Sequence, residues 1–405
     1  MSRRSRQHPG GRAMTGPHNI LFVVESLNVG GSEKFLKDLV LGLDRTKFSP
    51  TVCCLAGKGR LAEPLEKAGV RVVSLNWRLG SFASTVSAVF GLARLMHGEK
   101  ADLVQTIYYR PEILAALASC LVWRPVLVAS QHDVIVPEGR VSGALLRLSR
   151  LRVRHVIANC EACGRHRQSL TSHRPEQVSV IHIGLKPEEG PRPVAASASG
   201  SADRQAATGG SAAIDELFGS GPVVTYAGRL HPIKGPDVFL EAAAGLANRR
   251  PSVTFLLVGE GPMRAELAEQ AARLGLAQRI KFTGHVPSLM GVLRRSAVFV
   301  CSSRSEGFPS VVLEAMQAGV PVVASNVGGV PELVTDRVNG LLFESENHEQ
   351  LATLVEGLLL DEGAARTFAA KAREKVQREF RFEDTLAETR RLYLRLLGEE
   401  DHEAA

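Results

Sequence analysis

The sequence predicts an α/β protein with two doubly wound, Rossmann-like parallel-sheet domains that face each other across a central cleft. Three observations support this fold class. The 405 residues are enough for two or three domains. In both halves, short and continuous apolar runs rich in β-branched residues alternate with amphipathic helical segments. A stretch with almost no large apolar residues, "KPEEGPRPVAASASGSADRQAATGGSAA", separates the two halves.

These features divide the chain into five parts. Residues 1–17 are basic and lack an apolar run, which predicts a disordered tail and argues against a secretory signal. Residues 18–185 form the first α/β domain, 186–217 a flexible linker or insertion, and 218–378 the second α/β domain. Residues 379–397 predict a final helix with its own apolar face, which we expect to pack back on the first domain.

The expected strands follow one another in order along each half. Helical segments such as "EKFLKDLVLGL" and "MRAELAEQAARLG" lie between them. In open parallel sheets, ligands bind beyond the carboxyl ends of the strands, so the loops after these strands are the candidate sites. The predicted strands are NILFVVES, TVCCLAG, VRVVSLN, DLVQTIY, PVLVASQ, HVIANC and VSVIHIG in the first half, and VVTYAG, VTFLLVG, IKFTG, VFVCSS, PVVAS and LLFE in the second.

Two cations follow the first strand of the second half, in "VVTYAGRLHPIKGPDVFL". Arg229 and Lys234 lie on the loop that leads into a helix, where free backbone amides and the helix dipole also attract anions. This arrangement predicts a phosphate or diphosphate site. Gly259 and Gly261, in "LLVGEGPMRAEL", would let the next loop approach the same ligand, although they also fit a simple turn.

Two glutamates eight residues apart lie in "SSRSEGFPSVVLEAMQAG". Glu306 ends a buried strand, and Glu314 lies inside the short helix that follows. The amides of Gly307 and Phe308 would point to the same place, and Pro309 suits the first helical position. A carboxylate facing the cleft can accept hydrogen bonds from two neighbouring hydroxyls, as in a ribose diol.

The first half offers fewer candidates. Gly30 and Gly31 lie between its first strand and helix and would let backbone amides approach a ligand, but the spacing lacks the third glycine of the dinucleotide fingerprint. A dehydrogenase is therefore poorly supported. His132 follows a strand in "LVASQHDVI" and is either a ligand-facing or a structural histidine.

The sequence lacks the motifs that are typical of several kinds of enzyme chemistry. The sequence has no phosphate-binding P-loop, no zinc-protease or serine-hydrolase motif and no Asp-x-Asp pair, so we expect neither a metal nor another cofactor. Cys160 and Cys163 form one C-x-x-C without a second ligand pair, which favours a structural role at a helix start. With six cysteines in all, a reducing compartment is expected.

Charge is distributed unevenly. Residues 1–186 carry 26 Lys and Arg against 13 Asp and Glu, whereas residues 187–405 carry 23 against 29. The net charges are +13 and −6, which predicts an anionic partner for the first half, such as nucleic acid or an acidic membrane surface. The segment 140–154 can place Leu145, Leu148 and Leu151 on one side of a helix with arginines flanking them, which fits a membrane-surface helix or a core-packed helix with a solvated rim.

The motifs of the second half resemble the group 1 glycosyltransferases of family 4, which have the GT-B fold. "AGRLHPIKG", "LLVGEGP", "FTGHV", "SRSEGFPSVVLEAMQAGVPVVAS" and "VGGVPELV" occur in the family's order over about 120 residues. The E-x₇-E spacing from Glu306 to Glu314 is the most specific mark. In the first half, "VGGSEKFL" and the "QHD" region match more loosely.

The resemblance implies a retaining, metal-independent transferase that uses a nucleotide-diphosphate sugar. Arg229 and Lys234 would bind the diphosphate, and Glu314 the nucleotide ribose. Glu306 with the amides after it, and His132 from the other domain, would contact the donor sugar. Gly30 and Gly31 would let the first loop reach the phosphates.

The resemblance also implies partners and a place in the cell. The acceptor would be a carbohydrate or a lipid-linked sugar in cell-surface polysaccharide or glycolipid synthesis. The enzyme would be cytoplasmic, with contact to an anionic inner membrane face and no nucleic acid. A non-catalytic nucleotide-sugar-binding protein and a sugar-nucleotide epimerase of similar fold remain as alternatives.

Overall fold

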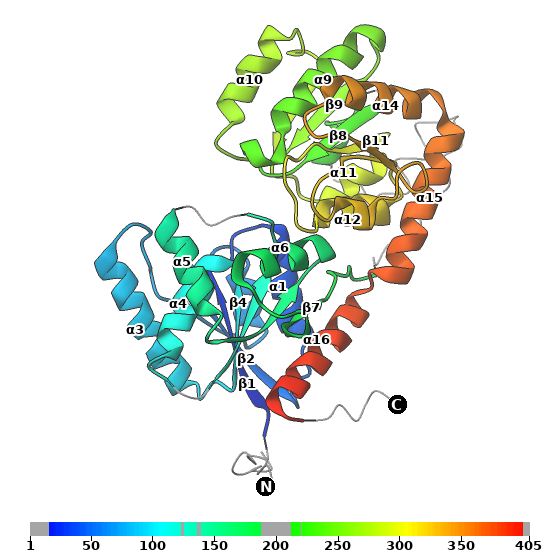
Figure 1. Cartoon of the computed structure of the whole chain (residues 1–405). Coiled ribbons are helices and arrows are strands. Elements are labelled where there is room, and N and C mark those ends of the chain that lie inside the picture. The colour runs from blue at the N-terminus through cyan, green and yellow to red at the C-terminus, as the bar shows by residue number, and fades with distance from the viewer. Residues whose placement is uncertain (1–15, 123–124, 136–138, 188–211, 220, 400–405) are drawn as a thin grey trace.

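A computed structural model describes the protein over residues 16–122, 125–135, 139–187, 212–219 and 221–399. The basic tail expected at 1–17 falls almost entirely outside these ranges, as does most of the linker expected at 186–217. The described residues form two α/β domains stacked one above the other (Figure 1).

The first domain is built on a parallel sheet. Its described strands lie in the order β3-β2-β1-β4-β5-β6-β7 and every neighbouring pair is parallel. Continuous apolar sequence makes the central strands buried on both faces, as expected when helices cover both sides. The strands are β1 (His18–Val24), β2 (Phe48–Cys54), β3 (Arg71–Ser74), β4 (Leu103–Ile107), β5 (Val126–Gln131), β6 (Val153–Ala158) and β7 (Val178–Val180).

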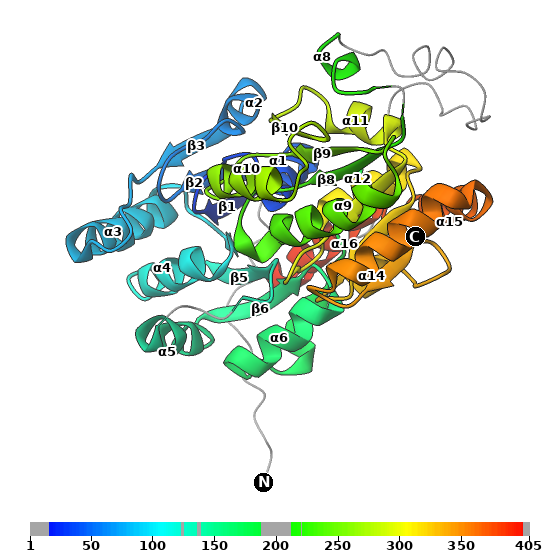
Figure 2. The same ribbon diagram turned by 90° about the horizontal axis from the view of Figure 1, so that it is seen from above.

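The helices of the first domain connect successive strands. In the view from above, α3, α4 and α5 lie side by side along one flank of this domain (Figure 2). The helices are α1 (Gly31–Gly42), α2 (Ala62–Lys67), α3 (Phe82–Gly98), α4 (Tyr109–Ser119), α5 (Arg140–Ser149) and α6 (Glu161–Thr171), with a 3₁₀ turn η1 (Pro175–Gln177) before β7.

The second domain repeats the plan. Its described strands lie in the order β10-β9-β8-β11-β12-β13, again all parallel. The strands are β8 (Val223–Ala227), β9 (Thr254–Val258), β10 (Ile280–Gly284), β11 (Val298–Cys301), β12 (Val322–Ser325) and β13 (Leu341–Phe343). The helical elements are α8 (Ala212–Asp215), η2 (Pro232–Lys234), α9 (Pro236–Arg249), α10 (Arg264–Arg273), α11 (Leu289–Arg295), α12 (Ser310–Ala318), α13 (Val330–Leu333), α14 (His348–Leu360) and α15 (Glu362–Glu379).

The two sheets confirm the fold class expected from the sequence. The predicted start of the second domain at residue 218 differs from the structure in one respect. Helix α8 precedes that position, and its Ile214 is only 4% exposed because it packs into the core of the second domain. Asp215 pairs with Arg295 of α11. The packed part of this domain therefore begins within the segment whose composition suggested a linker.

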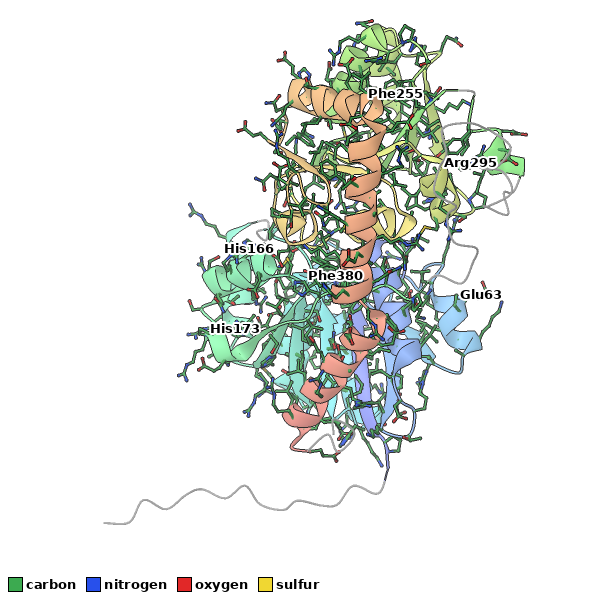
Figure 3. The ribbon with its side chains drawn as sticks, turned by 90° about the vertical axis from the view of Figure 1, so that its right-hand side faces the viewer. Glu63, His166, His173, Phe255, Arg295 and Phe380 are labelled. Carbon is green, nitrogen blue, oxygen red and sulfur yellow. The ribbon has the colours of Figure 1, made fainter. Side chains whose placement is uncertain are left out.

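The chain returns to the first domain at its carboxyl end. Helix α16 (Phe382–Leu397) follows α15 and lies against the first sheet, so that α15 and α16 together run along both domains (Figure 3). Tyr393 is fully buried there, packs edge-on against Phe48 and donates a hydrogen bond to Gln105. Where the chain crosses between domains, Leu185 and Arg381 form a short parallel bridge.

A buried ion pair ties α6 to α4 in the first domain. The Arg167 guanidinium is fully buried and donates to the Glu112 carboxylate, with Nη1 2.8 Å from Oε2. Ser149 also donates to Glu112. Because α6 begins at the edge that faces the second domain, this pair helps to set the geometry between the domains.

We predict that Arg167→Met destabilises the protein by about 3–5 kcal/mol, because the Glu112 charge stays buried without its partner. The readout is the midpoint of urea unfolding, since a two-domain chain need not unfold in one step. Arg174→Met is the matched control, because the Arg174 side chain is 78% exposed and should change stability by about 0.5 kcal/mol or less. Equal midpoints for the two variants would contradict the prediction.

Candidate functional site at the domain interface

Both sheets reverse their strand order at a switch point, and the loops there carry the candidate residues. In the first sheet β1 lies between β2 and β4, and in the second β8 lies between β9 and β11. Ligands of doubly wound sheets bind beyond the carboxyl ends of the strands at such points. Gly30 follows β1, Arg229 follows β8 and Glu306 follows β11. The candidates therefore come from positions where this topology places a ligand.

Lys234 and Glu306 are joined directly. The Lys234 ammonium lies 2.7 Å from each oxygen of the Glu306 carboxylate, and Ser303 Oγ donates to the same carboxylate at 2.6 Å. Glu306 is only 7% exposed. The sequence suggested two separate ligand contacts, whereas the structure couples the two side chains. A phosphate that binds Lys234 would compete with Glu306 for its charge.

Arg229 lies opposite a carboxylate that the sequence analysis missed. Its side chain is exposed, and within the described part of the chain it has no hydrogen-bond or ion-pair partner. Burial raises the pKa of Glu33, on α1 of the other domain, and the positive charge of Arg229 is among the factors that oppose this rise. Glu33 lies in the "VGGSEKFL" motif, but nothing in that pattern showed that its side chain would face the second domain.

Helices α1 and α12 face each other across the interface, and Figure 1 shows α12 at the edge of the second domain nearest to α1. Lys34 Nζ on α1 lies 3.7 Å from Glu314 Oε1 on α12. Burial raises the pKa of the Glu314 carboxyl, and Lys34 acts in the opposite direction. Glu314 therefore faces the first domain rather than solvent, and its charge is already matched by a cation.

Two of the predicted glycines lie where the domains come closest. A Cβ added to Gly31 would lie 2.5 Å from Ser310 Oγ, at the start of α12. A Cβ added to Gly307 would lie 2.1 Å from the carbonyl oxygen of His132. At Gly307 the obstacle is backbone, so a side chain there would force the loops apart, whereas the Ser310 hydroxyl opposite Gly31 could rotate aside.

The other predicted glycines pack against loops that carry site residues. A Cβ added to Gly30 would lie 2.2 Å from Glu33 Oε2, on the first turn of α1. Added Cβ atoms on Gly259 and Gly261 would lie 2.0 Å and 2.3 Å from the carbonyl oxygens of Gly228 and Leu230, on either side of Arg229. These two glycines thus support the Arg229 loop, and a direct contact with a ligand stays a prediction.

The Phe308 side chain is buried between other aromatic rings and is not available to a ligand, contrary to the role expected for it. It is 4% exposed and packs against His182 and Phe380, with ring centroids 5.1 Å and 5.4 Å away, at the crossing between domains. Only its backbone remains for a ligand. Pro309 precedes the first helical residue, Ser310, by one position, because its ψ of 105° is extended.

His132 is enclosed by residues of the first domain. It is 8% exposed, and its ring contacts those of Phe35 and Tyr108, each with its centroid 6.0 Å away. Its Nδ1 lies 3.2 Å from Ser32 Oγ. Burial lowers the pKa of His132 to about 4, so the imidazole is neutral at pH 7.

Two family models match this chain, one in each domain. The model described as "Glycosyl transferases group 1" matches residues 213–375, and the model described as "Glycosyltransferase Family 4" matches residues 29–189. Together they cover most of both domains. The chain belongs to the group 1 glycosyltransferases of family 4.

Curated relatives match over part of their length. A D-inositol 3-phosphate glycosyltransferase of Rhodococcus jostii is 40% identical over 159 residues, which are 37% of this chain and 35% of the relative. A GDP-mannose-dependent alpha-(1-6)-phosphatidylinositol monomannoside mannosyltransferase of Mycobacterium tuberculosis is 35% identical over 179 residues, which are 42% of this chain and 46% of the relative. The chain thus spans less than half the length of these relatives.

Solved structures match over nearly the whole chain. Anabaena HepE, in a crystal structure with UDP and glucose, is 26% identical with a TM-score of 0.78, over 93% of this chain and 99% of that one. A second crystal structure of HepE, in complex with UDP-glucose, is also similar to this chain. Sucrose-phosphate synthase of Thermosynechococcus elongatus, at 20% identity and a TM-score of 0.76 over 94% of this chain and 99% of that one, shares the fold.

In this family 4 chain, Glu332 links the two domains. The carboxylate of Glu332, on α13 of the second domain, accepts the backbone N–H groups of Glu161 and Ala162 at 3.0 Å each and contacts His182 Nε2 at 3.1 Å. It thereby satisfies free amides at the start of α6 in the first domain. Nothing in the sequence indicated this role for Glu332, because a capping contact between two domains has no local sequence signature.

The C-x-x-C pair contributes to the same contact. Cys160 precedes α6, its sulfur accepts the N–H of Cys163, and its thiol donates to the carbonyl oxygen of Gly307 at 3.4 Å. Both cysteines are buried. Among the described residues, no group of three or more His, Cys, Asp or Glu is arranged to hold a metal ion. The structure therefore supports the structural interpretation of this pair.

We predict that Gly307→Ala opens the interface between the domains, because its Cβ would overlap the His132 carbonyl. The radius of gyration from small-angle X-ray scattering should increase. The matched control is Gly357→Ala on α14, where an added Cβ meets no atom within 4 Å. If Gly307→Ala has the same radius as the parent protein, the contact does not hold the domains together.

Proposed function

We propose that this protein is a retaining glycosyltransferase that moves a sugar from a nucleotide-diphosphate donor to an acceptor hydroxyl in cell-surface polysaccharide or glycolipid synthesis. One observation carries the proposal. Arg229, Lys234 and the start of α12 gather on one side of the interface, directly opposite the Gly30–Gly31 loop. This arrangement offers cations, helix amides and close backbone approach together, which suits a diphosphate.

Each residue has a role in this proposal. Arg229 and Lys234 bind the diphosphate, and Glu314 accepts the two hydroxyls of the nucleotide ribose. Glu306 orients Lys234 and contacts the donor sugar with the amides that follow it. His132, as a neutral imidazole, contacts the sugar from the first domain. Gly259 and Gly261 shape the loop beside the diphosphate.

The reaction then depends mainly on charge stabilisation. As the sugar–phosphate bond breaks, negative charge grows on the leaving diphosphate, where Arg229 and Lys234 stabilise it. The departing phosphate oxygen takes the proton of the acceptor hydroxyl, which attacks from the same face, as the resemblance to retaining transferases implies. Contact between the domains excludes water from the reacting atoms. No step requires a metal ion.

The names of relatives support this class of donor. The Mycobacterium tuberculosis relative is GDP-mannose-dependent, and HepE binds UDP-glucose. Two alternatives make different predictions for the same assay. A non-catalytic binder would take up a nucleotide sugar without releasing the diphosphate. An epimerase would change the sugar while the nucleotide stays attached.

The assay incubates the protein with a panel of nucleotide sugars and candidate acceptors in the presence of EDTA. We predict that the protein releases nucleoside diphosphate from at least one of these nucleotide sugars. Arg229→Ala or Lys234→Ala should lower kcat/KM by roughly 10²–10³, the effect of removing one preorganised charge stabiliser. Arg366→Ala is the control, since that arginine forms an exposed pair with Glu362 on α15. Activity that disappears in EDTA and returns with Mg²⁺ would refute the metal-independent mechanism.

Helices α3 and α5 of the first domain each carry exposed apolar side chains, and exposed arginines accompany those of α5. Among the described residues no helix is both long and apolar enough to span a bilayer. The Phe82 side chain on α3 is 84% exposed. Further exposed apolar side chains on α3, on α5 or beside them are Leu79, Val86, Phe90, Val141, Leu148 and Leu151. The arginines Arg140, Arg147, Arg150 and Arg154 are exposed as well.

These exposed side chains extend beyond the helix that the sequence suggested. Leu148 and Leu151 are exposed as expected, but Leu145 is half-buried, and α5 ends at Ser149 because β6 begins soon after. Helix α3 adds an apolar ridge that the sequence analysis did not consider. We propose that α3 and α5 bind the anionic cytoplasmic membrane face, which would bring the site to a lipid-linked acceptor.

We predict that the protein floats with anionic vesicles at low salt, less with neutral vesicles, and less again at high salt. The double variant Phe82→Asp with Leu148→Asp should lose this binding, because it removes apolar contacts and adds negative charge. Leu360→Asp is the matched control, since Leu360 is a similarly exposed apolar residue at the end of α14 in the second domain. Equal recovery of both variants, or binding indifferent to salt, would exclude binding through these helices.

A further inference from the structure

Three side chains of the first domain form a chain of hydrogen bonds that ends at His132. The Tyr108 hydroxyl donates to Ser32 Oγ at 2.7 Å, and Ser32 Oγ lies 3.2 Å from His132 Nδ1. Ser32 is on α1, Tyr108 precedes α4, and His132 follows β5. Three separate segments of the chain therefore meet at this histidine.

The direction of these hydrogen bonds follows from their protons. The Tyr108 phenol donates to Ser32 Oγ, and burial, which raises the pKa of Tyr108, keeps that proton on the phenol. Ser32 Oγ accepts that proton and has a single proton of its own to give. Within the described residues, His132 Nδ1 is the acceptor available to it. Were Nδ1 protonated instead, the Ser32 proton would have no acceptor among them.

The ring is also held in place. The rings of Phe35 and Tyr108 each contact the His132 ring, with centroids 6.0 Å away, so rotation of the imidazole would disturb both contacts and break the hydrogen bond to Ser32. Tyr108 itself has a positive φ of 69°, a conformation that is strained for a residue with a side chain. The fold holds Tyr108 in a backbone conformation that glycine would adopt more easily, in the position where its hydroxyl reaches Ser32.

We propose that Tyr108 and Ser32 are positioning residues that fix His132 as the tautomer with the proton on Nε2. In the described part of the chain, Nε2 makes no hydrogen bond. It would then donate to an oxygen of the bound sugar, and it could not act as a base, because that nitrogen has no free lone pair. This assignment deepens the proposed function and rests on it only for the identity of the ligand.

The test is nuclear magnetic resonance of the full chain labelled with ¹⁵N-histidine at pH 7.5. Long-range proton–nitrogen correlations show which ring nitrogen is protonated, and His132→Gln identifies the His132 signals by their loss. The parent protein should show the Nε2-protonated tautomer. Ser32→Ala should give a mixture of tautomers, and Ser32→Thr, which keeps the hydroxyl, should restore the parent pattern. Tyr108→Phe should weaken the preference.

Ser169→Ala on α6 is the matched control, because Ser169 donates to the carbonyl of His166 and, within the described part of the chain, makes no hydrogen bond to Ser32, Tyr108 or His132. An Nδ1-protonated His132 in the parent, or an unchanged pattern in Ser32→Ala, would overturn the proposal. In the transferase assay, Ser32→Ala should lower kcat about tenfold with little change in KM. A protein with the expected tautomer but no transferase activity would refute the proposed function and leave the tautomer assignment standing.

Discussion

The carboxylate of Glu332 fixes how the two domains meet. It satisfies two backbone amides at the start of α6, so a residue of the second domain completes a helix of the first. Around it, Cys160 donates to the Gly307 carbonyl, and Phe308 packs into an aromatic group with Phe380. The buried apolar cluster continues from one domain into the other through these residues. The loops that follow β1 and β8 face each other because this contact holds.

The charges of the site are balanced by the protein itself. Lys234 is matched by Glu306, and Lys34 by Glu314, while Arg229 lies near Glu33. The interface is therefore close to neutral although it holds several cations. An incoming diphosphate would exchange one anionic partner for another, which limits the electrostatic cost of holding cations together without a ligand. It also means that binding strength depends on how readily Glu306 gives up Lys234.

The sequence was sufficient for the fold and for the local setting of several candidate residues. The alternation of strands and helices predicted both parallel sheets, and the strand–loop–helix pattern predicted that Glu306 follows a buried strand and that Glu314 lies inside the next helix. Residues that act through contacts between distant segments were missed. Glu332, Ser32 and Glu33 are residue types that are common on protein surfaces, and no local pattern shows where their side chains point. Only the folded structure shows their partners.

Helix α16 completes the core of the first domain, although it is the last helix of the described chain to be synthesised. Tyr393 fills the core of that domain beside Phe48 and Gln105, although the whole second domain separates them along the chain. During synthesis, the first domain is made first but lacks this part of its core until the second has emerged. Domains generally fold as units in the order of synthesis. Here the first domain cannot close this part of its core until α16, which is made after the second domain, is available. The apolar surface around Phe48 therefore stays uncovered while the second domain is being made.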